Sequence, residues 1–247
     1  MRSGFAQALT PAMSQPYPKR FYKTVSIAQD AGGWRVLLDG RAIRTPAKAV
    51  LIAPSETAAA LIAAEWDAQD EEVRPQTMPA TRLVNVAIDR TPLTRADIIA
   101  EARRYAETDL LCHRADAPAE LVARQSHAWD PLLAWAAETH GVALKTAPGV
   151  IAIAQDQAAL DAAAAAAAAL DDLRLTCLAH AAAIASSVVI GLALVARRLD
   201  AEDAFRMSRV DEDFQIERWG EDAEARAAAE ARRADLIAVG ALLKALP

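Results

Sequence analysis

The chain has 247 residues, of which 53% are hydrophobic, and its formal net charge at pH 7 is −6. This length suits one large domain or two ordinary ones and allows a sizeable core. The acidic balance argues against a nucleic-acid partner, because binding to a phosphate backbone needs clustered Lys and Arg. The two cysteines, Cys112 and Cys177, are too few for a disulfide framework and indicate a reducing compartment.

The N-terminal stretch carries no clear targeting signal. Residues 1–18 lack a long apolar segment, so we expect no secretory signal. Arg2 is the only basic residue there, so a disordered bacterial N-terminus over residues 1–19 is a simpler interpretation than a transit peptide.

Residues 20–53 have the pattern of β-strands. The Asp39-Gly40 pair between apolar residues is a two-residue hairpin signal. Strands are expected in FYKTVSIAQD before the hairpin, in WRVLLDG and RAIRTP on its two sides, and in AVLIAP after it. A sheet this small needs a partner that covers its apolar face.

From Ser55 onward the apolar residues recur with helical spacing. Ser55 is the expected N-cap of the first helix, and Thr94 and Asp200 are the expected caps of later ones. A loop is expected over 74–83, and an extended segment over 142–153 is a candidate to rejoin the sheet. An alanine-rich helix is expected after Asp156. Further helices are expected over 94–111, 119–140 (interrupted or restarted at Asp130-Pro131), 173–199 and 221–245.

The expected fold class is therefore α+β, with a small β-rich N-terminal domain over 20–90 and a mainly helical C-terminal domain over 91–247. The stretch from Leu175 to Ala196 has no formal charge and is long enough for a membrane span. Its Ala, Ser, Thr and His content favours a buried helix at the centre of the helical domain instead. Replacing Ile184 with Asp is therefore expected to destabilise the fold severely, because it would bury an unpaired charge.

No nucleotide-binding loop or nucleophile elbow occurs in the chain, so we expect no nucleotide cofactor. Cys112-His113 and Cys177-x-x-His180 could supply four zinc ligands, but their spacing is poor, and we expect no metal. An enzyme that uses carboxylates with His127 or His140 remains an alternative class.

The acidic stretch DFQIERWGED, residues 213–222, admits three interpretations: a solvated helix face with Trp219 in the core, a docking surface, or an acid–base or metal site. On a helix, Glu217 and Glu221 share one face and would repel each other unless solvent or a partner's cations met them. Trp and Arg beside charged residues are usual anchors of protein interfaces.

Seven segments occur in an order that resembles the ATP synthase assembly chaperones that handle the α subunit of the catalytic head. They are RFYKTV (20–25), LDGRAIRTPAK (38–48), AAEWDAQ (63–69), MPATRLVNVAID (78–89), YAETDLLCHR (105–114), LVARQSHAWDPLLAW (121–135) and FQIERWGE (214–221). The resemblance covers about residues 20–245.

This resemblance implies a non-enzymatic chaperone that binds the free α subunit and prevents its aggregation before β subunits join. We also expect a monomer, and the resemblance implies a bacterial member in the cytoplasm, with the mitochondrial matrix as the alternative location. We assign partner binding to Glu212, Gln215, Glu217, Trp219, Gly220 and Glu221, and structural roles to Glu65, Trp66, Asp67, Gln69, Trp129, Asp130 and Pro131.

Overall fold

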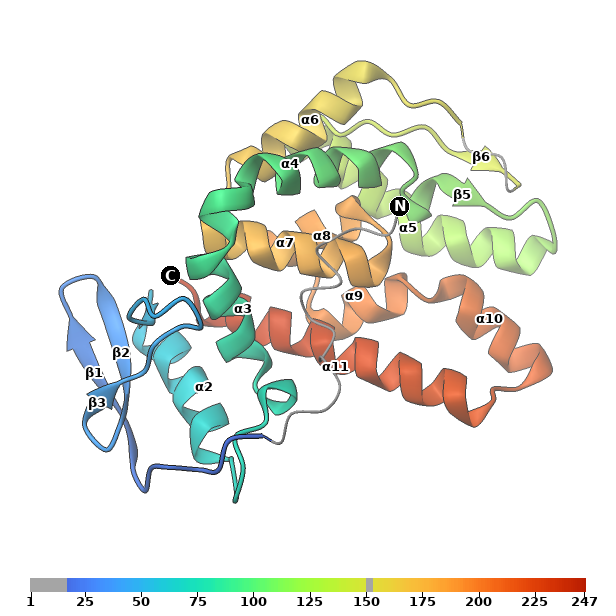
Figure 1. The fold of residues 1–247 in the computed structure, drawn as a ribbon. Coiled ribbons are helices and arrows are strands. Elements are labelled where there is room, and N and C mark those ends of the chain that lie inside the picture. Colours follow the sequence, from blue (N-terminus) through green and yellow to red (C-terminus); the bar gives the residue numbers. More distant parts are fainter. Residues whose placement is uncertain (1–16, 150–152) are drawn as a thin grey trace. The chain divides into compact units, whose positions relative to one another are not determined.

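The computed structural model describes residues 17–149 and 153–247 and divides into two compact units (Figure 1). Unit 1 contains the described residues up to Leu93 together with Ala241–Pro247, and unit 2 contains Thr94–Gly240. A small antiparallel sheet near the N-terminus and a predominance of helices after it confirm the expected α+β class. Most of the N-terminal stretch for which disorder was expected lies outside the described residues, but Pro18 and Lys19 pair with residues 72–73.

The sheet of unit 1 is built around one central strand. Strand β2 (Gly33–Leu38) pairs antiparallel with β1, β3 and β4. These neighbours are β1 (Val25–Asp30), β3 (Arg41–Ala42) and β4 (Ile52–Ala53), and all four predicted strands are confirmed in shorter form.

The predicted hairpin turn is also confirmed. Asp39 and Gly40 have φ values of 47° and 78°, the left-handed pair that a two-residue turn of this kind requires. The Asp39 carboxylate accepts hydrogen bonds from the backbone N–H groups of Lys23 and Thr24, which ties the turn to the chain before β1.

Helix α2 (Glu56–Asp67) packs against β1 and β2 and so covers the sheet. Its predicted cap is confirmed, because the Ser55 hydroxyl accepts a hydrogen bond from the Ala58 N–H at 3.0 Å. The expected loop over 74–83 was wrong in its second half, since η1 (Pro75–Thr77) is followed by helix α3 (Pro79–Asp89). Proline suits the first turn of a helix because the N–H it lacks would have no intrahelical acceptor there.

Unit 2 is a helical assembly with one short two-stranded sheet. Its elements are the larger part of α4 (Thr91–Glu107), η2 (Leu110–Cys112), β5 (His113–Arg114), α5 (Ala119–His140), β6 (Ala147–Pro148), α6 (Gln157–Ala168), α7 (Asp172–Ala185), α8 (Val188–Val195), α9 (Ala201–Met207), α10 (Val210–Trp219) and the part of α11 (Ala223–Ala245) that precedes Ala241. Helix α8 contacts α5, α7 and α9, and every residue from Val188 to Leu194 is buried.

The expected continuous helix over 173–199 was wrong, because α7 and α8 are separate helices. Ser186 has φ +52°, which ends α7, and the Ser187 hydroxyl accepts the Ile190 N–H at 3.1 Å, which starts α8. The break allows the two helices to pack on each other at Gly191, where a Cβ would lie 2.9 Å from Leu178 Cδ1. Ile184 is only half-buried, so the severe effect expected of a charge there is transferred to Ile190, which is fully buried.

Three further predictions in this region need correction. Helix α4 consists of two helical segments that meet at a kink at Thr94 (φ −120°, ψ 17°). A helix therefore begins after Thr94 as predicted, but a further turn from Thr91 precedes it, and the helix ends at Glu107 rather than near Leu111. Helix α5 continues through Pro131 without interruption. Strand β6 pairs in parallel with β5 rather than with the N-terminal sheet, and residues 150–152 of that predicted segment lie outside the described residues.

No helix in the described part of the chain combines the length and the apolar character needed to cross a membrane. The apolar stretch that suggested a span is divided between α7 and α8.

Candidate functional site

Helices α10 and α11 form a helical hairpin that carries the acidic stretch (Figure 1). Trp219, the last residue of α10, is 76% exposed, so the interpretation that places it in the core was wrong. Phe214, on the same helix, is buried. The hairpin is therefore attached through Phe214, while its end presents a large apolar side chain to solvent.

The carboxylates of the hairpin pair with arginines of the same chain. Arg209, whose side chain is largely buried, contacts Glu212 at 2.8 Å and Asp213 at 3.0 Å. Glu221 lies 3.1 Å from Arg226 and 3.9 Å from Arg209. The expectation that these acids repel one another was wrong, because cations already neutralise much of their charge.

A second group of ion pairs joins α10 to α5. Arg124 contacts Glu217 at 2.7 Å and Glu120 at 2.9 Å, and Arg218 contacts Glu120 at 2.8 Å. The hydrogen bond from Arg124 lowers the pKa of Glu217 below its ordinary value. The guanidinium groups of Arg124 and Arg218 also lie 5.2 and 4.3 Å from the Phe214 ring centre, so charge and aromatic packing hold α10 together.

Buried polar contacts complete the attachment of α10. Gln125 donates from Nε2 to Asp211 Oδ1 at 2.6 Å and accepts the Ala115 N–H at 2.8 Å. Trp129, a predicted structural residue, is fully buried and donates from Nε1 to the Met207 carbonyl at 2.8 Å. These bonds fix the start of α10 against α5, so the hairpin rests on a defined base.

Gly220 ends α10 with φ +81° and ψ 173°. This backbone conformation is essentially restricted to glycine. Gly220 therefore sets the direction in which the chain leaves Trp219.

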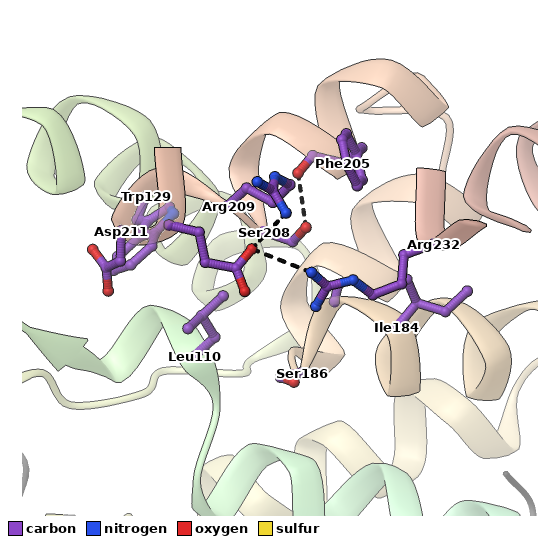
Figure 2. Close-up of a pocket in the computed structure, with 11 residues that line it drawn as sticks. Leu110, Trp129, Ile184, Ser186, Phe205, Ser208, Arg209, Asp211 and Arg232 are labelled. Atoms are coloured by element: carbon purple, nitrogen blue, oxygen red, sulfur yellow. Dashed lines mark hydrogen bonds and ion pairs between the residues drawn. The ribbon is translucent and has the colours of Figure 1, made fainter. Parts of the chain in front are cut away.

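Two concave regions border the hairpin. One, of about 340 Å³, lies between α10 and α11 and is lined by residues that include Gln215, Trp219 and Gly220. The other, of about 260 Å³, is shown in Figure 2, where Arg209 and Arg232 extend into it near Ile184 and Ser186. Glu212 contacts both arginines, at 2.8 and 3.5 Å, and lines both regions.

The six residues assigned to partner binding thus come together on one hairpin, and the three glutamates among them are already paired with arginines. Arg209, Arg124 and Arg232 were not among the site residues predicted from the sequence. The spacing of Arg209 to Glu212 and Asp213, at i+3 and i+4 on a helix, could have indicated the first of these. No local signal connects Arg124 with Glu217, which lies 93 residues away.

The Glu65–Gln69 segment has a different role in unit 1. The Glu65 carboxylate accepts the N–H groups of Ala80 and Thr81 at 2.6 and 2.8 Å and so caps α3. Burial raises the pKa of this carboxyl despite these bonds. Gln69 donates from Nε2 to the Glu65 carbonyl and accepts the Arg74 N–H at 2.7 Å, which shapes the connection to η1.

The other predicted structural residues make contacts within their own units. The Trp66 carbonyl accepts a hydrogen bond from the Tyr22 hydroxyl at 2.6 Å, and Asp67 lies 3.4 Å from Arg20. In unit 2, Asp130 forms an ion pair with Arg114 at 2.7 Å, and Pro131 lies within α5.

The cysteine and histidine residues considered as zinc ligands are not brought together as a metal site in the described part of the chain. Cys112 and Cys177 are buried, and burial raises the pKa of both thiols to about 12. Among the residues that the structure describes, no group of three or more His, Cys, Asp or Glu side chains could hold a metal ion.

Comparison with known proteins gives consistent matches. The family model described as ATP12 chaperone protein matches residues 19–137. Protein atp12, mitochondrial, of Schizosaccharomyces pombe is 25% identical over 230 residues, which cover 88% of this chain and 79% of that protein. The crystal structure of Atp12 from Paracoccus denitrificans is 41% identical, with a TM-score of 0.86 and coverage of 93% of this chain and 99% of that one. The Atu1473 protein of Agrobacterium tumefaciens is 40% identical, with a TM-score of 0.87 and coverage of 95% and 88%.

The match to the Paracoccus structure covers 93% of the chain and therefore extends over both units. The order of the sequence segments, the fold and the whole-length similarity therefore agree. The chain belongs to the ATP12 family of ATP synthase assembly chaperones.

Proposed function

We propose that this chain binds the unassembled α subunit of ATP synthase and prevents its aggregation until β subunits join. In this proposal it acts as a monomer in the bacterial cytoplasm and catalyses no reaction. An unassembled subunit exposes the apolar surface that its neighbour later covers, and large exposed apolar patches aggregate. A chaperone that covers this surface must bind it reversibly and leave when the neighbour arrives.

The observation that carries the proposal is the exposure of Trp219 on a firmly attached hairpin. An indole ring at 76% exposure is costly in water and is the type of side chain that most often anchors a protein interface. Its base is ordered by Phe214 and the Arg124–Glu217 pair, so little conformational entropy is lost when a partner covers it.

The carboxylates around Trp219 supply specificity rather than most of the affinity. Glu217 and Glu221 pair with arginines at the surface, so a partner's cation must compete with an existing pair. Charged groups at the rim of an interface mainly govern encounter rate and orientation. The hairpin therefore fits a partner surface with an apolar centre and a mixed, net basic rim.

The proposal is tested by co-expressing the chain with the α subunit and measuring soluble α subunit and its affinity for the purified chain. Trp219→Ala should weaken capture about tenfold or more, because it removes the anchor. Glu217→Lys with Glu221→Lys should weaken capture most at low salt, where screening is least. Circular dichroism melts check that both variants fold, because Trp219 and Glu217 are exposed but the Glu221 side chain is only 18% exposed.

Matched controls separate a local effect from a general one. Leu93→Ala removes another highly exposed apolar side chain. Glu107→Lys with Asp161→Lys reverses two exposed carboxylates that, like the hairpin pair, face an arginine, here Arg103. Capture that survives the Trp219 and Glu217/Glu221 changes would remove the hairpin from the contact surface, and a wild-type chain that leaves the α subunit insoluble would contradict the function itself.

A further inference from the structure

Unit 1 contains a concave region that the proposed contact surface does not use. It has a volume of about 550 Å³ and is lined by the aromatic side chains of Phe21, Tyr22 and Trp66 and by residues of the β2–β3 hairpin. Tyr22 is buried and packs edge-on against both other rings, at centroid distances of 5.3 and 5.7 Å. Phe21 is 71% exposed. We call this region the unit 1 cavity.

A single exposed Phe is ordinary on a protein surface. Phe21, however, packs against Tyr22, and Tyr22 is itself held in place. The Tyr22 hydroxyl donates a hydrogen bond to the Trp66 carbonyl, and the Arg20 guanidinium lies 4.6 Å from the Tyr22 ring centre. The cavity thus combines exposed apolar area with ordered aromatic side chains, against which an apolar side chain can pack.

The chain along the cavity also has unpaired backbone groups. Ile43 donates its N–H to Val36 O and accepts the Leu51 N–H, so its backbone groups face the sheet. In an extended antiparallel strand the backbone groups of successive residues point to opposite sides. Those of Ala42 and Arg44 consequently point away from the sheet, at a free edge of the type to which an extended peptide adds as a further strand.

The charge at this edge is positive. Arg41 and Arg44 line the cavity and are exposed, and among the described residues neither has a carboxylate partner. Asp39, the acidic residue of the lining, is occupied by the N–H groups of Lys23 and Thr24, and these bonds help lower its pKa. An occupant with carboxylates would therefore be favoured over a basic one.

We infer that the unit 1 cavity docks an extended segment of the client polypeptide that carries a large apolar side chain flanked by carboxylates. The apolar side chain packs beside Phe21, the carboxylates face Arg41 and Arg44, and the segment's backbone pairs with Ala42 and Arg44. This inference rests on the proposed function, because the client is taken to be the α subunit. Its preferred partner chemistry is opposite in charge to that of the α10–α11 hairpin.

The test measures the affinity of purified α subunit for wild type and for two variants. One variant carries both Arg41→Glu and Arg44→Glu, and the other carries Phe21→Ala. Each variant should bind about tenfold more weakly than wild type at low salt, and the loss caused by charge reversal should shrink as salt is added. Arg198→Glu with Lys244→Glu is the control, since it makes the same change in charge at exposed positions outside the cavity. If charge reversal lowers the melting temperature, Arg41→Gln with Arg44→Gln removes the charge at similar side-chain length.

Hydrogen exchange provides a second readout. The amides of Ala42 and Arg44 should exchange rapidly in the free chain and become protected in the complex, because a docked strand would accept hydrogen bonds from them. Unchanged exchange at both amides, or wild-type affinity in both the Phe21 and the Arg41/Arg44 variants, would overturn the inference. Loss of capture with Trp219→Ala alone would reject the cavity but retain the proposed function, whereas failure of wild type to bind the α subunit would reject both.

Discussion

Helix α8, helix α10 and the larger part of α11 belong to the same unit, but α8 and the α10–α11 hairpin are stabilised in opposite ways. Every residue of α8 from Val188 to Leu194 is buried, and the helix packs against three others. In α10 only Phe214 is buried, and the first turns of α11, over 223–228, are exposed. The first helix is stabilised by burial of apolar surface, the second by arginine–carboxylate pairs and a few anchors.

This difference explains how one unit can be stable and still offer a binding surface. Apolar area that a partner is to cover must remain in water in the free protein, so it cannot also stabilise the fold. Surface ion pairs contribute little to stability individually, but several together orient a helix without covering its apolar end. The hairpin therefore retains Trp219 for binding, while α8 and its neighbours supply the stability.

The largest effect on stability is expected from a charged side chain placed in α8. Ile190→Asp should lower the free energy of unfolding by about 4 kcal/mol or more, because the carboxylate would be buried without a partner. Ile190→Val, which removes one methylene, should cost about 1 kcal/mol. Urea unfolding followed by circular dichroism measures both, and a similar small effect of the two changes would show that α8 is not the stabilising core.

The pH dependence of stability gives a second test, at the buried carboxyl of Asp109 beside the start of α8. Asp109 is fully buried, accepts the N–H groups of Leu111 and Val189 at 3.0 and 3.2 Å, and has a pKa raised by burial from 3.8 to about 6. A raised carboxyl pKa means that the protonated form favours folding. Its contribution is fully present below pH 3.8 and is lost as the pH rises through about 6.

Asp109→Asn cannot ionise, so its stability relative to wild type should improve by up to about 3 kcal/mol between about pH 4 and pH 7. Denaturant unfolding at several pH values measures this difference. Because only the change with pH is compared, any constant cost of the amide at this position cancels. A difference that does not vary with pH would mean that water reaches the Asp109 carboxyl.

The smallest effect is expected in the hairpin. Gly220→Ala should cost about 1 kcal/mol, because φ +81° with ψ 173° is strained for any residue with a Cβ. No atom lies within 4 Å of the added Cβ, so the cost would come from the backbone rather than from a clash. A matched melt of Glu224→Ala in α11 controls for a surface change, and no loss in Gly220→Ala would show that the end of α10 relaxes freely.

Local patterns in the sequence determined the parts of the structure that a few neighbouring residues decide. The Asp39-Gly40 turn and the caps at Ser55 and Asp200 were predicted because their chemistry acts within four residues. The α+β class followed from the change in apolar period near Ser55. The family resemblance was equally accessible, since it rests on ordered segments of the chain.

Tertiary structure alone decided the candidate sites. Whether Trp219 is buried or exposed depends on what packs against the end of α10, and the pairing of Arg218 with Glu120 joins residues 98 apart. The break at Ser186 likewise depends on distant contacts, because Ser186 O accepts the Leu110 N–H and Asp109 accepts the Val189 N–H. The sequence determined which helices could form, and long-range packing decided which of their side chains remained free to meet a partner, because burial depends on contacts between segments that are far apart in the chain.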